Sequence, residues 1–291
     1  MTVSQAHQVE SGVGRIDRNV VFGTYCGLAL LMDVHHPPHA NGYALALIPG
    51  SGWTSRQTYD APLLTTLASS IQFFVPSLLD AGYTLFVLNH RNGPRFHHPD
   101  AVNDVQRAIR FIRFWADKYQ VNPSRIGAVG FSSGGQLAAL LGVLESTEAH
   151  VDADPVSRVS PRVQSVVAAA APMNFMHFHP PEWAIFIGQL VGLPGGPPDP
   201  IALEAYRDAS PIAHVSASSA PMLLLHGDAD DVVPVQMAQA MHQVMKNAGA
   251  DVTLIELPGG SHNFARESGG HPDWPDFLSE TVRWIDCHLK S

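Results

Sequence analysis

Short apolar runs alternate with longer stretches of helical periodicity along nearly the whole chain. A strand that is apolar at every position is typical of a parallel sheet covered on both faces, and amphipathic stretches between such strands are typical of crossover helices. In one such stretch, residues 100–119, apolar side chains recur near the spacing of one helix face: Val102, Val105, Ile109, Ile112 and then Phe114 or Trp115. The alternation predicts an α/β fold, with helices flanking a mostly parallel sheet.

The apolar pattern gives the expected order of elements. Eight segments are expected to be strands, the first two forming a hairpin: residues 19–22, 28–34, 43–48, 83–89, 125–131, 163–171, 221–226 and 252–257. Five segments are expected to be helices: residues 69–81, 100–119, 134–143, 235–248 and 276–289. Pro76 lies inside the first of these helices, which should therefore be kinked or divided into two pieces.

One segment, residues 173–209, interrupts the alternation and is called the insertion below. It is rich in proline, glycine and large apolar residues, and a structureless loop of this length is uncommon in a compact domain unless it is functional. We expect it to be a lid over a pocket, the alternative being a small helical subdomain that packs its own core. The apolar residues expected to line the substrate pocket are Trp53, Phe175, Trp183 and Phe186. Since no repeat or linker is evident, residues 1–291 are expected to form a single domain.

Composition excludes several classes of function. The formal net charge is -9, which argues against nucleic acid or an anionic membrane as a partner. No run approaches the about 18 apolar residues of a membrane span, and residues 1–18 lack the apolar core of a signal peptide. The sequence therefore predicts a soluble, cytoplasmic protein. Cys26 and Cys287 match no metal-binding spacing and are expected to be thiols rather than a disulfide.

The sixteen histidines do not form a recognisable metal site. Residues 35–36 and 97–98 are adjacent pairs, and neighbours in an extended segment point to opposite sides. His177 and His179 lack an obvious third ligand. We therefore expect neither a metal ion nor another cofactor.

A G-x-S-x-G motif occurs once, as Gly-Phe-Ser-Ser-Gly at residues 130–134. It lies between an expected strand and an expected helix, where a sharp turn would lift the hydroxyl of Ser132 above the edge of the sheet. Flanking glycines allow the backbone to bend there, and the helix N-terminus offers N–H groups to a developing oxyanion. Ser132 is the expected nucleophile.

A serine hydroxyl is a poor nucleophile until a base takes its proton. In this fold pattern the base follows the last strand, and an acid follows the strand before it. His262 follows the last strand in a glycine-rich turn and is the expected base. Three carboxylates follow the preceding strand. Asp228 is suited to hydrogen-bond its own turn, and Asp231 is close to the N-terminus of the next helix, which leaves Asp230 as the expected acid.

These residues resemble the α/β-hydrolase superfamily, and more narrowly the carboxylesterases and feruloyl- or acetyl-xylan-type esterases, whose motifs overlap with the prolyl oligopeptidase catalytic domain. The run H-G-D-A-D-D-V-V-P at residues 226–234 is similar to the motif H-G-x-x-D-x-x-V-P, which marks Asp230 as the acid. Residues 89–91, 101–102, 104–112, 123–126 and 208–212 are also similar to segments of these enzymes. The resemblance covers residues 20–289 and implies an α/β-hydrolase fold with an eight-stranded sheet.

The loop after the third strand departs from this family pattern. Residues 49–53 read P-G-S-G-W, whereas the family often has H-G-G-G-W. The resemblance implies an oxyanion hole formed by the backbone N–H group of Ser51 or Gly52 together with that of Ser133. Because proline replaces the histidine and donates no hydrogen bond, the support of this loop must differ.

The sequence thus predicts a serine carboxylic-ester hydrolase that acts through an acyl-enzyme on small to medium acyl or aryl esters. The alternative is a serine peptidase or amidase of the oligopeptidase type, since the same triad serves both. The chain has no room for the N-terminal propeller common in oligopeptidases. A non-catalytic binding protein of this fold would commonly lack a triad member, and all three are present. A small-molecule ester is the expected partner, and the sequence predicts no oligomeric state.

Overall fold

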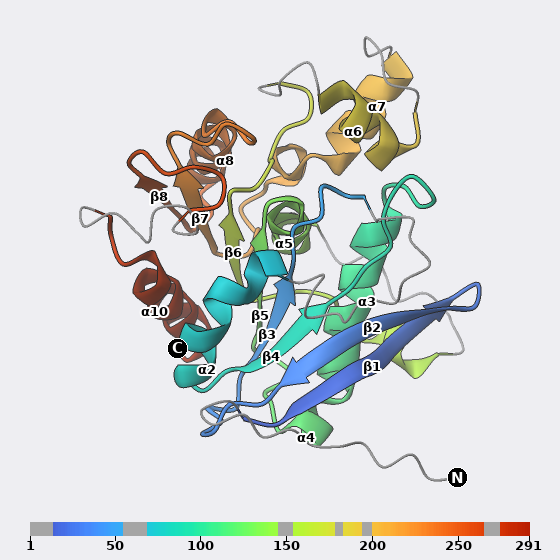
Figure 1. Ribbon diagram of the computed structural model, residues 1–291, viewed down its shortest axis with the longest axis vertical. Coiled ribbons are helices and arrows are strands. Elements are labelled where there is room, and N and C mark those ends of the chain that lie inside the picture. The colour runs from blue at the N-terminus through green and yellow to red at the C-terminus, as the bar shows by residue number, and fades with distance from the viewer. Residues whose placement is uncertain (1–13, 55–68, 145–153, 178–182, 194–199, 265–273) are drawn as a thin grey trace.

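The protein is an α/β structure built around one eight-stranded sheet, as the computed structural model shows (Figure 1). The structure describes residues 14–54, 69–144, 154–177, 183–193, 200–264 and 274–291. The strands lie in the order β1-β2-β4-β3-β5-β6-β7-β8. They are β1 (Ile16–Tyr25), β2 (Leu28–His35), β3 (Ala44–Ile48), β4 (Thr84–Leu88), β5 (Ile126–Phe131), β6 (Ser165–Ala169), β7 (Met222–Gly227) and β8 (Val252–Leu257).

The sheet is antiparallel at one side and parallel elsewhere. Strands β1 and β2 form a hairpin, and β2 pairs antiparallel with β4. All pairs from β4 through β8 are parallel. The prediction of eight strands in a mostly parallel sheet is confirmed.

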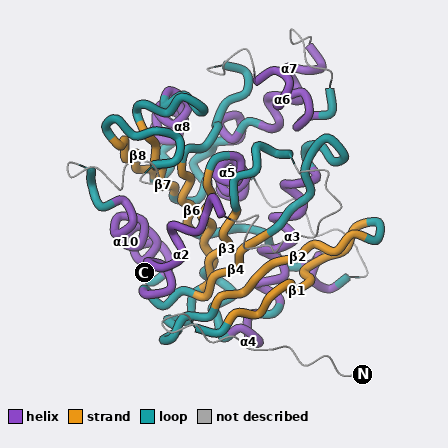
Figure 2. The backbone as a smooth tube through the Cα atoms, in the orientation of Figure 1, coloured by secondary structure: helices purple, strands orange, loops and turns teal. Residues whose placement is uncertain are grey.

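Helices cover both faces of the sheet (Figures 1 and 2). The helices are η1 (Ser69–Phe74), α2 (Val75–Asp80), α3 (Asp100–Phe114), α4 (Ala116–Tyr119), α5 (Ser133–Val143), η2 (Pro155–Arg158), α6 (Trp183–Val191), α7 (Pro200–Ala209), η3 (Pro211–His214), α8 (Gln236–Asn247) and α10 (Phe277–Leu289). Apolar residues of α3, α5 and α8 form one core, and those of η1, α2 and α10 form another.

The two cores explain why the strands are apolar at every position. In β3, Ala44, Ala46 and Ile48 pack into the core with α3 and α5, whereas Leu45 and Leu47 pack into the core with α2 and α10. Successive side chains of a strand point to opposite faces, so a strand between two helix layers has no polar face. The sequence pattern was therefore a direct consequence of this layered arrangement.

Two expected helices are divided. The helix predicted at residues 69–81 is η1 followed by α2, and Pro76 lies in the first turn of α2, where its missing N–H removes no intrahelical bond. The helix predicted at residues 100–119 ends at Phe114, and α4 follows after Trp115. The prediction that Phe114 or Trp115 continues the buried face is wrong, because both are exposed at this break and Phe111 is buried instead.

The parallel strands place six loops at one edge of the sheet. The register pairs Ile48 with Gly130 and Phe131 with Ala169, and it pairs Gly227 with Leu257 at the other side of β7. The loops that leave β3, β4, β5, β6, β7 and β8 therefore begin at the same edge. Ligands of open α/β sheets bind outside the carboxyl ends of the strands, and this edge carries the residues singled out from the sequence.

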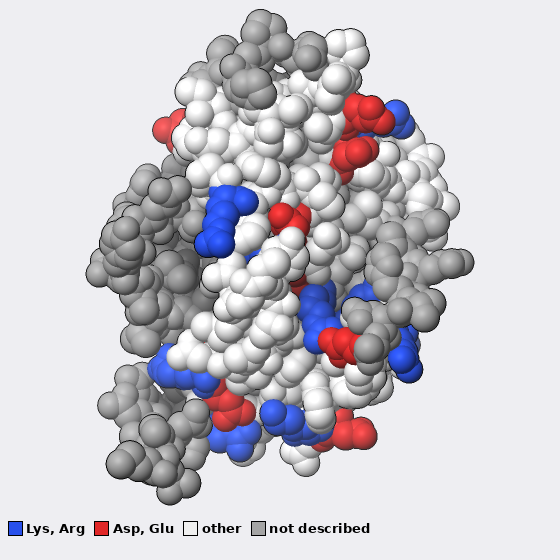
Figure 3. Space-filling model, turned by 90° about the vertical axis from the view of Figure 1, so that its right-hand side faces the viewer, with Lys and Arg blue, Asp and Glu red and all other residues white. Residues whose placement is uncertain are grey.

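The surface and the helices have few special features. Figure 3 shows lysine and arginine side chains interspersed with aspartate and glutamate on the face in view. Cys26 and Cys287 are both free and exposed, which confirms that they form no disulfide. Among the helices in the described ranges, none is both long and apolar enough to span a bilayer.

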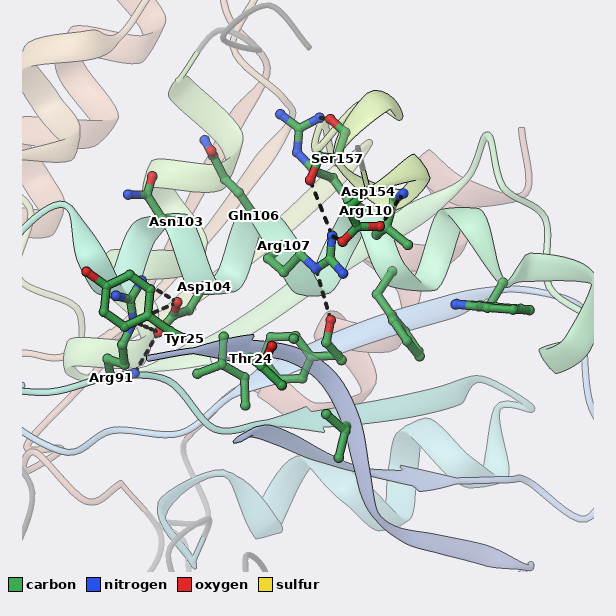
Figure 4. A pocket seen from close by; sticks show the side chains of 17 residues that line it. Thr24, Tyr25, Arg91, Asn103, Asp104, Gln106, Arg107, Arg110, Asp154 and Ser157 are labelled. Atoms are coloured by element: carbon green, nitrogen blue, oxygen red, sulfur yellow. Dashed lines mark hydrogen bonds and ion pairs between the residues drawn. The ribbon is translucent and has the colours of Figure 1, made fainter. Parts of the chain in front are cut away.

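A hollow of about 840 Å³ lies between β1, α3 and η2 (Figure 4). Its polar lining is largely engaged in internal interactions. Arg107 pairs with Asp154 and donates to the carbonyl oxygen of Phe22, while Arg110 donates to the carbonyl oxygen of Ser157. None of its lining residues is one of the predicted triad residues, so this hollow is separate from the candidate site.

A buried ion pair ties the end of β4 to α3 beside this hollow (Figure 4). Asp104 accepts from the side chain of Arg91 at 2.7–3.0 Å and from its backbone N–H at 2.8 Å. A second ion pair joins Arg91 to Asp100, and the guanidinium lies 3.9 Å from the ring centre of Tyr25. Both charges of the central pair are buried, so each depends on the other for solvation.

We expect Asp104→Asn to lower the free energy of unfolding by about 3 kcal/mol, because the buried guanidinium of Arg91 would lose its carboxylate partner. Urea unfolding followed by circular dichroism measures the change. The control is Glu280→Gln, which breaks the exposed pair with Arg283 and should cost less than about 1 kcal/mol. Equal costs for the two variants would contradict the importance given to the buried pair.

Candidate active site

Ser132 lies at the turn between β5 and α5, in the position expected of a nucleophile. Its backbone has φ 54° and ψ -125°, a conformation that side-chain-bearing residues rarely adopt. Its N–H donates to the carbonyl oxygen of Ala169 at 2.8 Å, and its carbonyl oxygen accepts from Gln136 at 3.1 Å. The turn is therefore held by hydrogen bonds on both sides of the strained residue.

The flanking glycines are needed for close packing. A Cβ at Gly130 would lie 2.1 Å from the carbonyl oxygen of Gly134, and a Cβ at Gly134 would lie 2.1 Å from that of Ile48. Neither glycine has a positive φ, whereas Ser132 does. The sequence interpretation, in which glycines supply the bend, is corrected: Ser132 makes the bend, and the glycines let β3, β5 and α5 approach each other.

The structure brings the three predicted triad residues together. Nδ1 of His262 lies 2.8 Å from Oδ2 of Asp230, and its Nε2 lies 3.1 Å from Oγ of Ser132. A carboxylate only accepts hydrogen bonds, so Nδ1 carries the proton and Nε2 is left to accept from the serine hydroxyl. This tautomer is the one that a general base for Ser132 requires.

The carboxylate of Asp230 is fully buried and is held by several donors. Its Oδ1 accepts from the N–H groups of Val232 and Val233 at 2.9 and 2.7 Å. Burial raises the pKa of Asp230, but the hydrogen bonds of His226 and His262, the charge of His262 and the N–H of Val233 outweigh burial, so its pKa lies well below the usual range. A group with a lowered pKa stabilises the folded state above its ordinary pKa and loses that contribution as the pH falls. Asp230 is therefore ionised throughout the neutral range.

His226 is a residue of the site that the sequence analysis did not assign. It ends the apolar part of β7 and is only 1% exposed. Its Nε2 lies 2.8 Å from the carbonyl oxygen of Val233 and 3.2 Å from Oδ2 of Asp230. Both partners are acceptors, so Nε2 carries a proton and is a donor. The signal in the sequence is its place as the first residue of the H-G-x-x-D motif, four residues before Asp230.

The other two carboxylates after β7 have different surroundings. Asp228 accepts a hydrogen bond from the N–H of Gly259 at 2.5 Å. It therefore stabilises the loop that carries His262, whereas the sequence analysis expected it to hydrogen-bond its own turn. Asp231 is exposed. The geometry therefore agrees with Asp230 as the acid, and gives Asp228 a structural part between the acid loop and the histidine loop.

The loop at residues 49–54 lies against the start of α5, and hydroxyl groups hold its backbone. The N–H of Gly50 donates to Oγ of Ser70 at 2.8 Å. The N–H groups of Ser51 and Gly52 both donate to Oγ of Ser133, at 2.8 and 3.0 Å. The expected oxyanion donors Ser51, Gly52 and Ser133 are thus adjacent, but the two loop amides are directed at a side chain of the same site.

Trp53 and Phe175 lie together in the apolar core of the insertion, with ring centres 5.3 Å apart. Trp183 is partly buried against this core, and Phe186 is 47% exposed. The insertion contains helices α6 and α7, and it shares its core with Trp53 from the loop after β3. Residues 178–182 and 194–199 of the insertion lie outside the described ones. The buried residues of this core are Trp53, Phe175, Ile187, Leu190, Ala202, Tyr206 and Ala209.

A polar link connects this core to the nucleophile helix. Nε1 of Trp53 donates to Oε1 of Gln136 at 3.0 Å, and Nε2 of Gln136 donates to the carbonyl oxygen of Ala209 at 2.7 Å. Gln136 is fully buried in α5. The loop at residues 49–54, the helix after Ser132 and the end of the insertion are therefore joined through one side chain.

Comparison with known proteins agrees with this geometry. The model of the BD-FAE family matches residues 32–245, which is most of the chain. The chain belongs to the BD-FAE family. The match begins in β2 and ends in α8, so it contains Ser132 and Asp230 and stops before His262.

Relatives of this BD-FAE protein include esterases. A probable carboxylic ester hydrolase, LipM of Mycobacterium tuberculosis, is 28% identical over 85% of this chain and 56% of its own length. The ethyl acetate hydrolase of Pseudomonas putida is 27% identical over 90% of this chain and 80% of its own length. The chain spans about half the length of the first curated relatives that it matches, from 51% to 59%.

Among solved structures, a truncated carbohydrate esterase from gut microbiota is similar over 98% of this chain and 100% of its own. The TM-score is 0.79 and the sequence identity is 26%. This likeness confirms the α/β-hydrolase fold that the sequence motifs implied.

We expect Asp230→Asn to lower kcat by several orders of magnitude with little loss of folding, because the asparagine would not fix His262 in the required tautomer. Asp228→Asn is the matched variant. It removes a brace on Gly259 and should cost roughly 1 kcal/mol of stability while most of the activity remains. Steady-state ester hydrolysis and thermal unfolding measure both effects. An inactive Asp228→Asn beside a normal Asp230→Asn would contradict this assignment.

We expect His226→Phe to reduce kcat by about tenfold, since Asp230 would lose one of its donors while the buried volume is kept. The loss of a hydrogen bond to a charged group should also destabilise the fold by about 2 kcal/mol. Ester kinetics and urea unfolding measure the two effects. A variant with unchanged kcat would show that the contact between His226 and Asp230 has no part in orienting the acid.

Proposed function

We propose that this protein is a serine carboxylic-ester hydrolase acting through a Ser132–His262–Asp230 triad and an acyl-enzyme. The observation that carries the proposal is the continuous hydrogen-bonded chain from Oγ of Ser132 through His262 to the buried Asp230. The strained turn at Ser132 gives further support, because backbone strain of this kind is concentrated at functional sites.

In the first half of the reaction, Oγ of Ser132 attacks the carbonyl carbon of the ester while its proton moves to Nε2 of His262. The carbonyl electron pair moves onto oxygen, which becomes an oxyanion at the N-terminus of α5. The bond between the carbonyl carbon and the alkoxy oxygen then breaks. The proton on His262 passes to the departing alcohol, and the acyl group stays on Ser132.

In the second half, water replaces the alcohol. His262 takes a proton from water as the water oxygen attacks the acyl-enzyme, and the bond to Oγ of Ser132 breaks as the proton returns to Ser132. Asp230 stays ionised and stabilises the imidazolium in both halves, and its lowered pKa supports that role. The products are a carboxylic acid and an alcohol.

We propose small to medium acyl or aryl esters as substrates. The names of the esterase relatives, ethyl acetate hydrolase among them, point to the same class. A serine peptidase or amidase remains the alternative, because an amide could be attacked by the same triad.

The test is a panel of p-nitrophenyl esters of rising acyl length, measured beside an aminoacyl anilide. We expect the short esters to be hydrolysed much faster than the anilide. Ser132→Ala should lose on the order of 10⁴-fold or more in kcat while thermal unfolding stays close to that of the unmodified protein. Organophosphate labelling, read by peptide mass spectrometry, should modify Ser132. Full activity of Ser132→Ala would refute the proposal, and preference for the anilide would favour the peptidase alternative.

A further inference from the structure

The hydroxyl of Ser133, next to the nucleophile, has no role in the mechanism above. Ser133 as a residue is 1% exposed. Its Oγ accepts hydrogen bonds from the N–H groups of Ser51 and Gly52. A serine hydroxyl has two acceptor lone pairs and one donor hydrogen. Since both acceptor positions are taken by the loop, the hydroxyl hydrogen must point away from it. Among the described residues, the structure records no hydrogen bond in which this hydroxyl is the donor.

The surroundings place this hydroxyl at the turn of the nucleophile. A Cβ at Gly50 would lie 2.9 Å from Cβ of Ser132, so the loop passes directly beside Ser132. Ser133 is the first residue of α5, and the N–H groups in the first turn of a helix have no intrahelical partner. The N–H and the O–H of Ser133 are therefore two donors on the residue that follows Ser132.

We propose that Ser133 supplies two donors to the oxyanion, its backbone N–H and its side-chain O–H, and that Ser51 and Gly52 act through this hydroxyl. This inference rests on the proposed ester hydrolysis. The oxyanion accepts both hydrogen bonds without a proton transfer. Hydrogen bonds from the two loop amides polarise the O–H group and make it a stronger donor. The hydroxyl is thus a catalytic group, and the loop at residues 49–54 is its support.

This arrangement differs from the one implied by the family resemblance, in which the loop amides contact the oxyanion directly. In the structure those amides lie 2.8 and 3.0 Å from Oγ of Ser133, which are distances of good hydrogen bonds. Direct contact would require both to break. Ser133→Ala separates the two arrangements, because it removes the hydroxyl and leaves every backbone N–H in place.

The experiment measures kcat and KM of Ser133→Ala for p-nitrophenyl acetate and for its thiono analogue, in which sulfur replaces the carbonyl oxygen. We expect kcat for the oxygen ester to fall on the order of 10²-fold, as for the loss of one oxyanion donor, with little change in KM. The thiono ester should lose much less, because sulfur is a weak hydrogen-bond acceptor. Ser133→Thr keeps the hydroxyl and should recover most of the activity on the oxygen ester.

The matched control is Ser165→Ala, which removes a buried serine hydroxyl at the start of β6, the end of that strand that lies away from the candidate site. This variant should leave the rates for both esters unchanged. A Ser133→Ala variant as fast as the unmodified protein would overturn the proposal, since the freed loop amides would then suffice. An equal fall for both esters would overturn it as well, because it would indicate a structural effect. If Ser133→Thr does not fold, the ratio of the two esters in Ser133→Ala decides alone. Absence of ester hydrolysis by the unmodified protein, or full activity of Ser132→Ala, would instead refute the proposed function.

Discussion

The close approach of three backbone segments around Ser132 is the constraint on which the rest of the site depends. Gly130 and Gly134 allow β5, α5 and the end of β3 to meet at distances that exclude even a methyl group. The backbone strain at Ser132 persists because these contacts and two hydrogen bonds surround it. Strand β3 enters this contact through the carbonyl oxygens of Ile48 and Pro49. The loop that follows β3 therefore begins at a fixed place beside the nucleophile.

A second backbone contact holds together the loops that carry Asp230 and His262. A Cβ at Gly227 would lie 2.1 Å from the carbonyl oxygen of Gly260, so the loops after β7 and β8 are in contact along their main chains. The N–H of Ala229 donates to that oxygen at 3.1 Å. The distance between Asp230 and His262 is thus set by main-chain packing, and the buried donors around Asp230 keep its charge ionised.

The sequence predicted the sheet, the turn at Ser132 and the three side chains that the structure joins in one hydrogen-bonded chain. Each of these depends on local patterns: apolar runs, the G-x-S-x-G motif and glycine turns after strands. The sequence did not predict the break at Trp115 or the part of His226. The contacts of His226 with Asp230 and Val233 depend on how the turn after β7 folds back, which the motif alone does not show. The prediction that apolar residues of the insertion line a pocket was only partly informative. Some of these residues lie in a core, as Phe175 does, and others are exposed, as Phe186 is. The bond from the loop amides to Ser133 was equally inaccessible, because a motif does not show where a side chain points.

The link through Gln136 bears on how sequences of this kind can diverge. Gln136 reaches the insertion at a main-chain carbonyl oxygen, that of Ala209, and every amino acid supplies that acceptor. The attachment therefore places no demand on the hydrogen-bonding chemistry of the side chains in α6 and α7. Substitutions that keep the apolar core of the insertion can accumulate there without loosening its connection to Trp53 and the nucleophile helix. The outer surface of the insertion can therefore change freely, while its point of attachment to Gln136 stays the same.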